Sequence, residues 1–317
     1  FILIFLAIPT VRTIFQTQAK VAAGALEIEV IGHQWWWEFR YPQYGITTAN
    51  EVYMPLGRTI DFRLNTADVI HSFWIPGLGG KRDAVYQPNS GWVKYRQNHI
   101  WFTADSTTED AFNGFCAEYC GTSHANMRFK AYVVSGDNFQ SWVTHQQKPA
   151  VFPAAPAPAP QPTGRRAAAA PPPAPVAAGF IRFGRAKMPA YTIPQTPIPA
   201  SIGYDTTLVG DAARGRMVVT TGACIACHTI KGEQIMVGTI GPNLTHVGSR
   251  LTIGGGLFPN DTKHLASWIK SSGAMKPGSK MNTFGKGQFD HISKAILQVG
   301  YSDQQIADIV AYLQALK

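Results

Sequence analysis

Four residues in one short stretch of the sequence could bind a metal ion. Cys116 and Cys120 are followed at regular steps by His124 and Met127, so two thiols, an imidazole and a thioether fall within twelve residues. In an oxidising compartment, two cysteines this close would by default form a local disulfide. A thioether adds little to a zinc site, whereas thiolate, imidazole and a weak methionine ligand together suit copper. The stretch therefore predicts copper in preference to zinc or a disulfide.

A second group of residues has the spacing that attaches a haem. Cys224 and Cys227 are separated by two residues and followed at once by His228. In such a pentapeptide the two thiols form thioether bonds to the porphyrin and the histidine binds its iron. The same run could also belong to a zinc site or a redox pair. Pro242, within Gly-Pro-Asn-Leu, follows soon after and favours haem.

Residues 210–317 resemble a small class I cytochrome c domain. In that family the carbonyl of the matching proline orients the haem-binding histidine, so the resemblance gives this role to Pro242. It also implies a sixth ligand well downstream, and a Pro-Gly-rich loop that ends in Met281 matches the family's loop. Met275 is then a packing residue. The family usually has proline where Asn282 stands, which is a departure in the local loop.

Two further residues of this stretch stand where family members often hydrogen-bond the haem propionates. They are Arg250 and Trp268, although Trp268 could serve the core alone. Gly215 and Tyr312 are expected at the crossing of the first and last helices, in a packing role. The other histidines lack a partner at ligand spacing and are expected to be structural or exposed: His33, His99, His145, His246, His264 and His291.

The first stretch resembles the binuclear CuA motif of cytochrome c oxidase subunit II, in which two thiolates bridge two copper ions. Residues 68–76 match the family's earlier strand, which supplies a second histidine. The resemblance implies that Glu118 contributes its backbone carbonyl to copper and its carboxylate to a magnesium ion at the boundary with subunit I. It implies these side-chain copper ligands: His71, Cys116, Cys120, His124 and Met127.

Three successive tryptophans form the third matching element, within residues 32–39. On a strand, such a run ordinarily means one or two buried rings and one ring at the surface. The family has an exposed tryptophan at the position of Trp35, through which electrons reach the copper. Nitrous oxide reductase has a similar copper spacing, but the tryptophan run and the apolar N-terminus favour the oxidase.

The rest of the sequence divides by composition. Between residues 26 and 134, short β-branched and aromatic runs alternate with polar residues, as in an antiparallel sandwich or barrel. Residues 148–178 are almost entirely Pro and Ala, which is typical of an extended linker. Residues 179–185 are more complex and are expected to lie against a partner surface. From about Asp205 the pattern is helical, and Ser302 with Gln305 forms a capping box before the last helix.

Residues 1–8 are wholly apolar, and the run continues to Arg12. A bilayer needs about 20 apolar residues, so we expect this to be the end of a transmembrane helix with more sequence upstream. A buried strand or a trimmed signal peptide is the alternative. The predicted fold is multi-domain: helix end and exit at 1–24, an all-β cupredoxin-like Greek-key barrel with CuA at 25–147, a Pro/Ala-rich linker at 148–204, and an all-α cytochrome c domain at 205–317.

The net charge of +9 is unevenly distributed. Residues 1–147 carry −1, residues 148–204 carry +6 and residues 205–317 carry +4. The excess lies in the linker and in scattered lysines, unlike the clustered basic face of a nucleic-acid-binding protein. Nucleic acid is therefore not an expected partner, and the two domains should dock only weakly by charge.

The predicted function is electron relay as subunit II of a cytochrome c oxidase, from haem c to CuA and on to the haem-copper centre of subunit I. The chain shows no base, nucleophile or phosphate loop and is an enzyme only within its complex. Expected partners are subunit I, other membrane subunits, a donor complex or cytochrome, and the membrane. Both domains should lie on the periplasmic face of a bacterial inner membrane. The alternative is a free-standing membrane-anchored copper and haem carrier for another terminal reductase.

Overall fold

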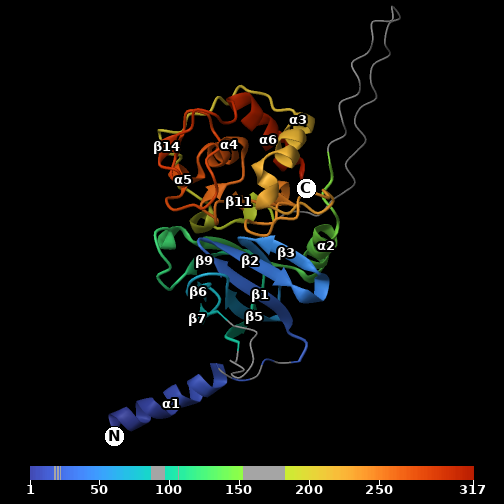
Figure 1. Ribbon diagram of the computed structural model, residues 1–317. Coiled ribbons are helices and arrows are strands. Elements are labelled where there is room, and N and C mark those ends of the chain that lie inside the picture. Colours follow the sequence, from blue (N-terminus) through green and yellow to red (C-terminus); the bar gives the residue numbers. More distant parts are fainter. Residues whose placement is uncertain (18, 20, 22, 87–96, 106, 153–182) are drawn as a thin grey trace, which may run out of the picture.

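The computed structural model describes residues 1–17, 19, 21, 23–86, 97–105, 107–152 and 183–317 (Figure 1). We call residues 26–147, which hold two five-stranded sheets, the β part. We call residues 205–317, which hold the helices α3 to α6, the helical part. The helical part packs on one end of the β part, and the N-terminal helix projects from the opposite end (Figure 1).

The N-terminal helix α1 (Ile2–Thr17) has 16 residues and contains Pro9. All its side chains are exposed, and most of them are apolar. Among the residues that the structure describes, no helix is long and apolar enough to cross a membrane. The transmembrane assignment of residues 1–24 therefore stays a prediction.

The β part consists of two sheets with the strand orders β3-β2-β1-β5-β8 and β4-β10-β9-β6-β7. The strands of the first sheet are β1 (Leu26–His33), β2 (Trp36–Tyr41), β3 (Ile46–Ala49), β5 (Thr59–Thr66) and β8 (His99–Thr103). Those of the second sheet are β4 (Glu51–Pro55), β6 (His71–Trp74), β7 (Lys81–Ala84), β9 (Asp110–Cys116) and β10 (Arg128–Val134). The predicted β-rich domain is thus confirmed.

The sheets are not purely antiparallel, which corrects the expectation from the sequence. β1 pairs in parallel with β5, and β4 pairs in parallel with β10. Parallel strands need a connection of a dozen or more residues, and in both pairs other strands lie between the partners along the chain. Alternating apolar residues reveal a half-buried strand but not the direction of its neighbour.

An aromatic cluster joins the two sheets. Phe73 and Phe129 stack with ring centroids 4.9 Å apart, and Trp37 meets Phe73 edge-on at 5.6 Å. These rings are almost fully buried, and edge-on and offset contacts are the arrangements that aromatic rings prefer. Trp37 also lies 5.8 Å from the ring of His71. The core therefore fixes the position of the first candidate copper ligand.

Helix α2 (Gly136–Gln147) closes the β part. Ser135 caps it by accepting a hydrogen bond from the backbone N–H of Asn138. Trp142 on this helix stacks on Tyr53 of β4 at 5.0 Å. Short 3₁₀ helices also occur, at Pro42–Tyr44, His124–Asn126, Arg185–Lys187, Ala190–Thr192, Ala223–Ala226 and Val247–Ser249.

The helical part is built on the crossing of its first and last helices. Its helices are α3 (Ala212–Thr221), α4 (Thr262–Lys270), α5 (Ser272–Met275) and α6 (Asp303–Ala315), and two short ladders pair β11 (Thr252–Ile253) with β12 (Phe258–Pro259) and β13 (Phe289–Asp290) with β14 (Ala295–Ile296). A Cβ on Gly215 would lie 1.9 Å from the carbonyl oxygen of Asp308. Only glycine allows α3 to approach α6 so closely, and the predicted capping box of α6 is present.

The segment before the helical part lies on the β part. Lys187 pairs with Glu109 at 3.0 Å, and Phe183 packs on Tyr132 with ring centroids 5.1 Å apart. Of the residues 179–185 expected against a partner, 179–182 lie outside the described residues, while Phe183 contacts the same chain.

Candidate metal and haem centres

The structure brings three of the predicted copper ligands together. One donor atom each from His71, Cys116 and Cys120 lies within 4.8 Å of the others, and all three residues are buried. His71 begins β6 and Cys116 ends β9, and the pairing of these strands sets the two ends side by side. A Cβ on Gly32 would lie 2.5 Å from the His71 ring, so this glycine lets β1 approach the site.

The remaining predicted ligands surround the two sulfurs. Cys120 Sγ lies 3.6 Å from His124 Nδ1 and 3.8 Å from Met127 Sδ. Cys116 Sγ lies 3.2 Å from the carbonyl oxygen of Glu118. All six predicted donor groups therefore converge on one place, and their soft sulfur and imidazole character fits copper.

The two sulfurs are 3.7 Å apart and both cysteines are free. A disulfide has an S–S distance of about 2.05 Å, so the disulfide alternative is not what the structure contains. The hydrogen-bond contact with Cys120 lowers the pKa of Cys116 to about 4, and the same contact together with burial raises the pKa of Cys120. Binding of a metal ion would deprotonate both thiols, because a cation offsets the repulsion between two thiolates.

Asp68 orients the histidine ligand. Its Oδ1 lies 2.9 Å from His71 Nε2, which leaves Nδ1 of the ring facing Cys116 at 3.7 Å. Such partners commonly fix the orientation of a metal-binding histidine. Burial opposes ionisation of Asp68, but hydrogen bonds with His71 and from backbone N–H groups, including that of Gln34, lower its pKa to about 2.

The predicted haem attachment segment also has the expected local geometry. Cys224 lies in the 3₁₀ helix Ala223–Ala226 and Cys227 follows it directly, and the backbone N–H of His228 donates to the carbonyl of Cys224 at 3.0 Å. His228 Nδ1 donates to the carbonyl of Pro242 at 2.8 Å, which leaves Nε2 for iron. A Cβ on Gly241 would lie 2.6 Å from the His228 ring. These residues fit a covalently attached haem.

The two candidate methionines differ in burial. Met275 is 5% exposed and belongs to the core of the helical part. Met281 is only partly buried, and its carbonyl accepts a hydrogen bond from the Ser272 hydroxyl at 2.8 Å. This difference agrees with a packing role for Met275, and the choice of Met281 as ligand stays a prediction.

The two residues predicted near the propionates lie in different surroundings. Arg250 donates to the carbonyl of Asn243 at 2.5 Å, and burial lowers its pKa to about 10. Trp268 packs beside Phe258 with ring centroids 6.3 Å apart, and is partly buried in the core. Both contacts are with other residues of the protein, so the haem roles of Arg250 and Trp268 stay predictions.

Trp35 is covered, which corrects the exposed position expected for it. It is 9% exposed, and its indole N–H donates to the carbonyl of Cys120 at 2.9 Å. A Cβ on Gly278 would lie 2.8 Å from the indole ring, so the loop 276–281 of the helical part lies directly on Trp35. The exposed position was expected because the family has an exposed tryptophan there. The covering loop is far from Trp35 in the sequence, with Lys276 241 residues away, and the tryptophan run carries no information about it.

Several residues at the junction of the two parts were not singled out from the sequence. Lys276 Nζ donates to the carbonyl of Trp35 at 2.6 Å, and Lys280 Nζ donates to Gln34 Oε1 at 3.0 Å. Glu51 accepts hydrogen bonds from the backbone of the helical part. Glu51 could have been singled out from the sequence, because it is the one charged residue in the otherwise largely apolar run 51–55. The contact between the β part and the helical part therefore depends on buried hydrogen bonds, which the net charges of the two parts did not predict.

Three of the histidines predicted to be structural lie in ordinary polar contacts. His246 lies 3.1 Å from the carbonyl oxygen of Lys148, and His145 lies 3.3 Å from Ser249 Oγ. His99 pairs with Asp61 at 2.8 Å. Two of these contacts join α2 and its end to the helical part, so they add to the junction.

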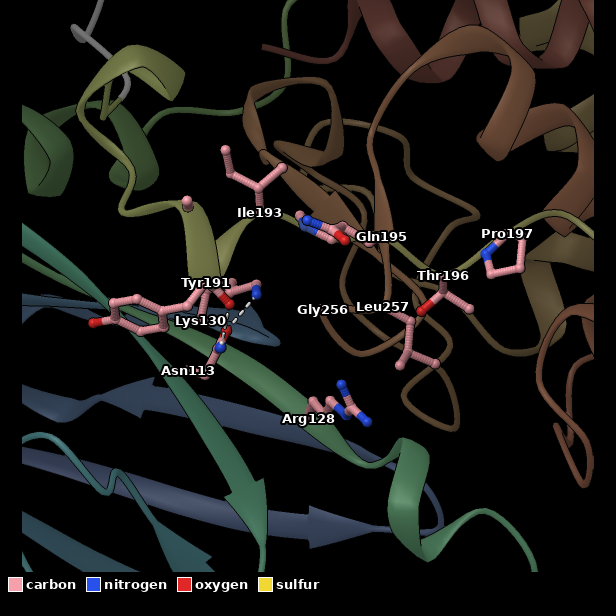
Figure 2. Close-up of a pocket in the computed structure, with 12 residues that line it drawn as sticks. Asn113, Arg128, Lys130, Tyr191, Ile193, Gln195, Thr196, Pro197, Gly256 and Leu257 are labelled. Carbon is pink, nitrogen blue, oxygen red and sulfur yellow. Dashed lines mark hydrogen bonds between the residues drawn. The ribbon is translucent and has the colours of Figure 1, made fainter.

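A cavity of about 440 Å³ lies where both parts meet the segment 190–197 (Figure 2). Lys130 on its wall donates to Asn113 Oδ1 and to the carbonyl of Thr192, both at 2.5 Å. Burial lowers the pKa of Lys130 to about 8. The ammonium group thus ties the segment to the β part, and Gly256 of the helical part forms another wall.

Two family descriptions match the chain. Residues 46–134 match "Cytochrome C oxidase subunit II, periplasmic domain", and residues 212–317 match "Cytochrome c". The first match falls within the β part and the second within the helical part. The cupredoxin-like and cytochrome c assignments are thereby confirmed, and the domain boundaries given above stay predictions.

Curated relatives match both parts together. Cytochrome c oxidase subunit 2 of Alkalihalophilus pseudofirmus is 30% identical, and the match covers 100% of this chain and 70% of that protein. The protein of the same name from Bacillus sp. strain PS3 is 28% identical over 100% of this chain and 71% of its own length. The solved periplasmic domain of cytochrome oxidase subunit II from Bradyrhizobium japonicum is 31% identical, with a TM-score of 0.36, over 40% of this chain and 97% of that chain.

Proposed function

Since the chain belongs to the cytochrome c oxidase subunit II family, we propose that it relays electrons from haem c to a binuclear copper centre and on to the haem-copper centre of subunit I, where oxygen is reduced to water. Membership makes it an electron-transfer subunit of an oxidoreductase complex, with copper and haem c as cofactors and other oxidase subunits, including subunit I, as partners. Its location is extracytoplasmic. The 3.7 Å separation of two buried thiols carries the binuclear proposal.

The proposed copper ligands act as a rigid cage. The copper would be held by the thiolates of Cys116 and Cys120 and by four further donors: His71, His124, Met127 and the carbonyl of Glu118. When bound, copper and haem c supply one-electron redox chemistry. His71 begins β6, Cys116 ends β9, and the other four donors lie in the short segment between β9 and β10. Because paired strands hold both sides of the site, the chain need not rearrange when the charge of the site changes.

The proposed haem site uses residues of the helical part. Cys224 and Cys227 would attach the porphyrin, while His228 and Met281 would bind its iron. The hydrogen bond to Pro242 supports this proposal, because it holds His228 in one tautomer with Nε2 free. Arg250 and Trp268 are proposed to contact the haem from the same part.

Two roles beside the copper site are also proposed. Trp35 would pass electrons to the copper, and its indole contact with the carbonyl of Cys120 supports this. The Glu118 carboxylate would help to hold magnesium at the boundary with subunit I. The side chain of Glu118 is exposed, which supports a contact outside this chain.

The remaining parts of the proposal concern location and donors. We propose that residues 1–24 end a membrane anchor, that 25–147 and 205–317 are the two domains on the periplasmic side of a bacterial inner membrane, and that 148–204 connect them. A donor complex or cytochrome would reduce haem c. A free-standing carrier is not favoured, because relatives over the full chain are oxidase subunits.

The proposal is tested by the copper and iron content of the purified polypeptide, together with visible and near-infrared spectra. We expect two coppers for each iron, a mixed-valence band and a six-coordinate c-haem spectrum. One copper or none per haem would overturn the binuclear assignment. In that case the oxidase family would stand, and the ligand set would have to be revised.

A further inference from the structure

The two parts of the chain meet through buried polar contacts that lie outside both proposed ligand sets. We propose, resting on the function above, that Glu51 and the loop 276–281 lock the helical part on the β part in one orientation, as positioning residues for electron transfer from haem c to copper. The surface of the β part around Trp35 and Glu51 is thus covered by the helical part of the same chain.

Glu51 supplies the first contact. It begins β4 and is 3% exposed. Its Oε1 accepts hydrogen bonds from the backbone N–H groups of Leu251 at 2.9 Å and Thr252 at 2.8 Å, and from the Thr252 hydroxyl at 2.9 Å. All three donors belong to the helical part, so these bonds exist only while the two parts are docked.

The carboxyl group of Glu51 faces cations of both parts. Burial raises its pKa, whereas the hydrogen bonds from Thr252 and the charge of Arg250 act in the opposite direction. Lys130, directly opposite Glu51 in the β10 ladder, feels the same carboxylate from the β part. A buried carboxyl group that loses its hydrogen-bond donors keeps the full cost of its desolvation. A rotated or shifted dock would leave this carboxylate buried without them, so the contact selects one orientation.

The loop 276–281 supplies the second contact. Gly278 has φ +86 and packs on the indole of Trp35 and on Thr122, to which a Cβ would approach within 2.8 and 3.2 Å. Lys276 is buried and donates to the carbonyls of Trp35 and of Gly254, so it joins both parts. No larger side chain fits at Gly278 in this position.

Three successive glycines extend the contact towards a proposed copper ligand. Gly254, Gly255 and Gly256 all have positive φ. A Cβ on Gly255 would lie 3.4 Å from the carbonyl oxygens of Asn126 and Arg128, and one on Gly256 would lie 3.4 Å from Phe129 Cα. The glycine run therefore lies against the backbone on either side of residue 127.

These contacts link the two proposed ligand sets. The loop on Trp35 ends at Met281, and the indole of Trp35 donates to the carbonyl of Cys120 at 2.9 Å. One aromatic ring thus separates the loop of the proposed haem ligand from a proposed copper ligand. Electron transfer slows steeply with distance, so a lock that holds this contact sets the internal rate. A tether alone gives an effective concentration of about millimolar and does not orient the domains.

The test uses the full-length chain in the assembled oxidase, with both cofactors bound. Gly278→Ala adds one methyl group at the Trp35 contact, while Gly287→Ala is the matched control, since Gly287 has φ +77 and nothing within 4 Å of its Cβ. Two readouts are compared: the rate of haem c oxidation by copper after rapid reduction, and hydrogen exchange of the peptides that contain Trp35 and Thr252.

We expect Gly278→Ala to slow internal transfer by roughly 10-fold or more, as misplacement at a reacting contact can do, and to speed exchange at both peptides. Gly287→Ala should change neither. Glu51→Ala should act like Gly278→Ala, and Glu51→Gln, which keeps an acceptor oxygen, should lie between Glu51→Ala and wild type. Glu109→Gln is the control for the carboxylate, because Glu109 binds the N–H of Ser135 within the β part.

The outcomes separate this inference from the proposed function. If wild-type protein shows no transfer from haem c to copper, the proposed function itself fails. If wild type transfers electrons and both Gly278→Ala and Glu51→Ala match it in rate and exchange, the lock is overturned. Unchanged haem and copper spectra in the variants establish that a slower rate reflects docking and not a lost cofactor.

Discussion

At the scale of single residues, the choice between two methionines decides how the haem is held. Met281→Ala should remove the sixth ligand, so we expect loss of the six-coordinate low-spin spectrum while the haem stays covalently attached. Met275→Ala should keep that spectrum, because Met275 lies in the core, and should lower stability by about 2–5 kcal/mol, as core truncations do. Visible spectra and thermal unfolding check both, and a normal spectrum for Met281→Ala would contradict the assignment.

Glu109 gives the β part a stability that depends on pH. Burial opposes its ionisation, but hydrogen bonds from Ser135 and Asn138 and the nearby Lys187 lower its pKa from 4.5 to about 2. Its contribution is therefore fully present above about pH 4.5 and is lost as the pH falls towards about 2. We expect Glu109→Gln to be less stable than wild type at neutral pH, with the difference shrinking in acid.

Thermal unfolding of the β part between about pH 3 and pH 7 checks this expectation. A difference between Glu109→Gln and wild type that stays constant down to about pH 3 would show that the charge of Glu109 is not what stabilises α2 and the Lys187 segment.

At the scale of elements, the crossing of α3 and α6 depends on one glycine. A Cβ on Gly215 would lie 1.9 Å from the Asp308 carbonyl oxygen, so Gly215→Ala must push the two helices apart. Overpacking of this kind costs about 1–3 kcal/mol. Unfolding followed by haem absorbance measures it, and Gly136→Ala, with nothing within 4 Å, should leave that transition unchanged. Equal transitions in the two variants would contradict tight packing at the crossing.

The clustered members of both proposed ligand sets could be predicted because they are close in sequence, whereas His71 and Met281 came from the family resemblance alone. Cys116 to Met127 and Cys224 to His228 each repeat a short spacing that reflects local chemistry. The capping box of α6 was also readable, since its two members are three residues apart. Short-range signals of this kind survive in a sequence because one turn of chain fixes their geometry.

Contacts between distant segments could not be predicted in this way. Glu51 meets Leu251 across 200 residues, and β1 pairs with β5 in parallel although three strands intervene. Neither contact produces a repeating pattern of residue types in the sequence. The covered position of Trp35 was missed for the same reason, because the tryptophan run does not reveal which segment packs on it.

At the scale of the whole molecule, the junction predicts how the oxidase responds to salt. Buried hydrogen bonds are screened far less than exposed charges, and Glu51 and Lys276 are both buried. We expect the rate from haem c to copper to change by less than about threefold between about 50 mM and about 500 mM salt. Rapid-reduction kinetics at several ionic strengths measure it, and a change of orders of magnitude would mean that surface charge governs docking.

The loop 276–281 over Trp35 also keeps other proteins away from this side of the proposed copper site. While the two parts stay in contact, no second protein can touch this indole, because a segment of the same chain already occupies its face. If Trp35 passes electrons to the copper as proposed, other soluble proteins are kept from reducing the copper at that point. Electrons would then enter only from proteins that can reduce the helical part, so the fusion of the two parts would also select the donor.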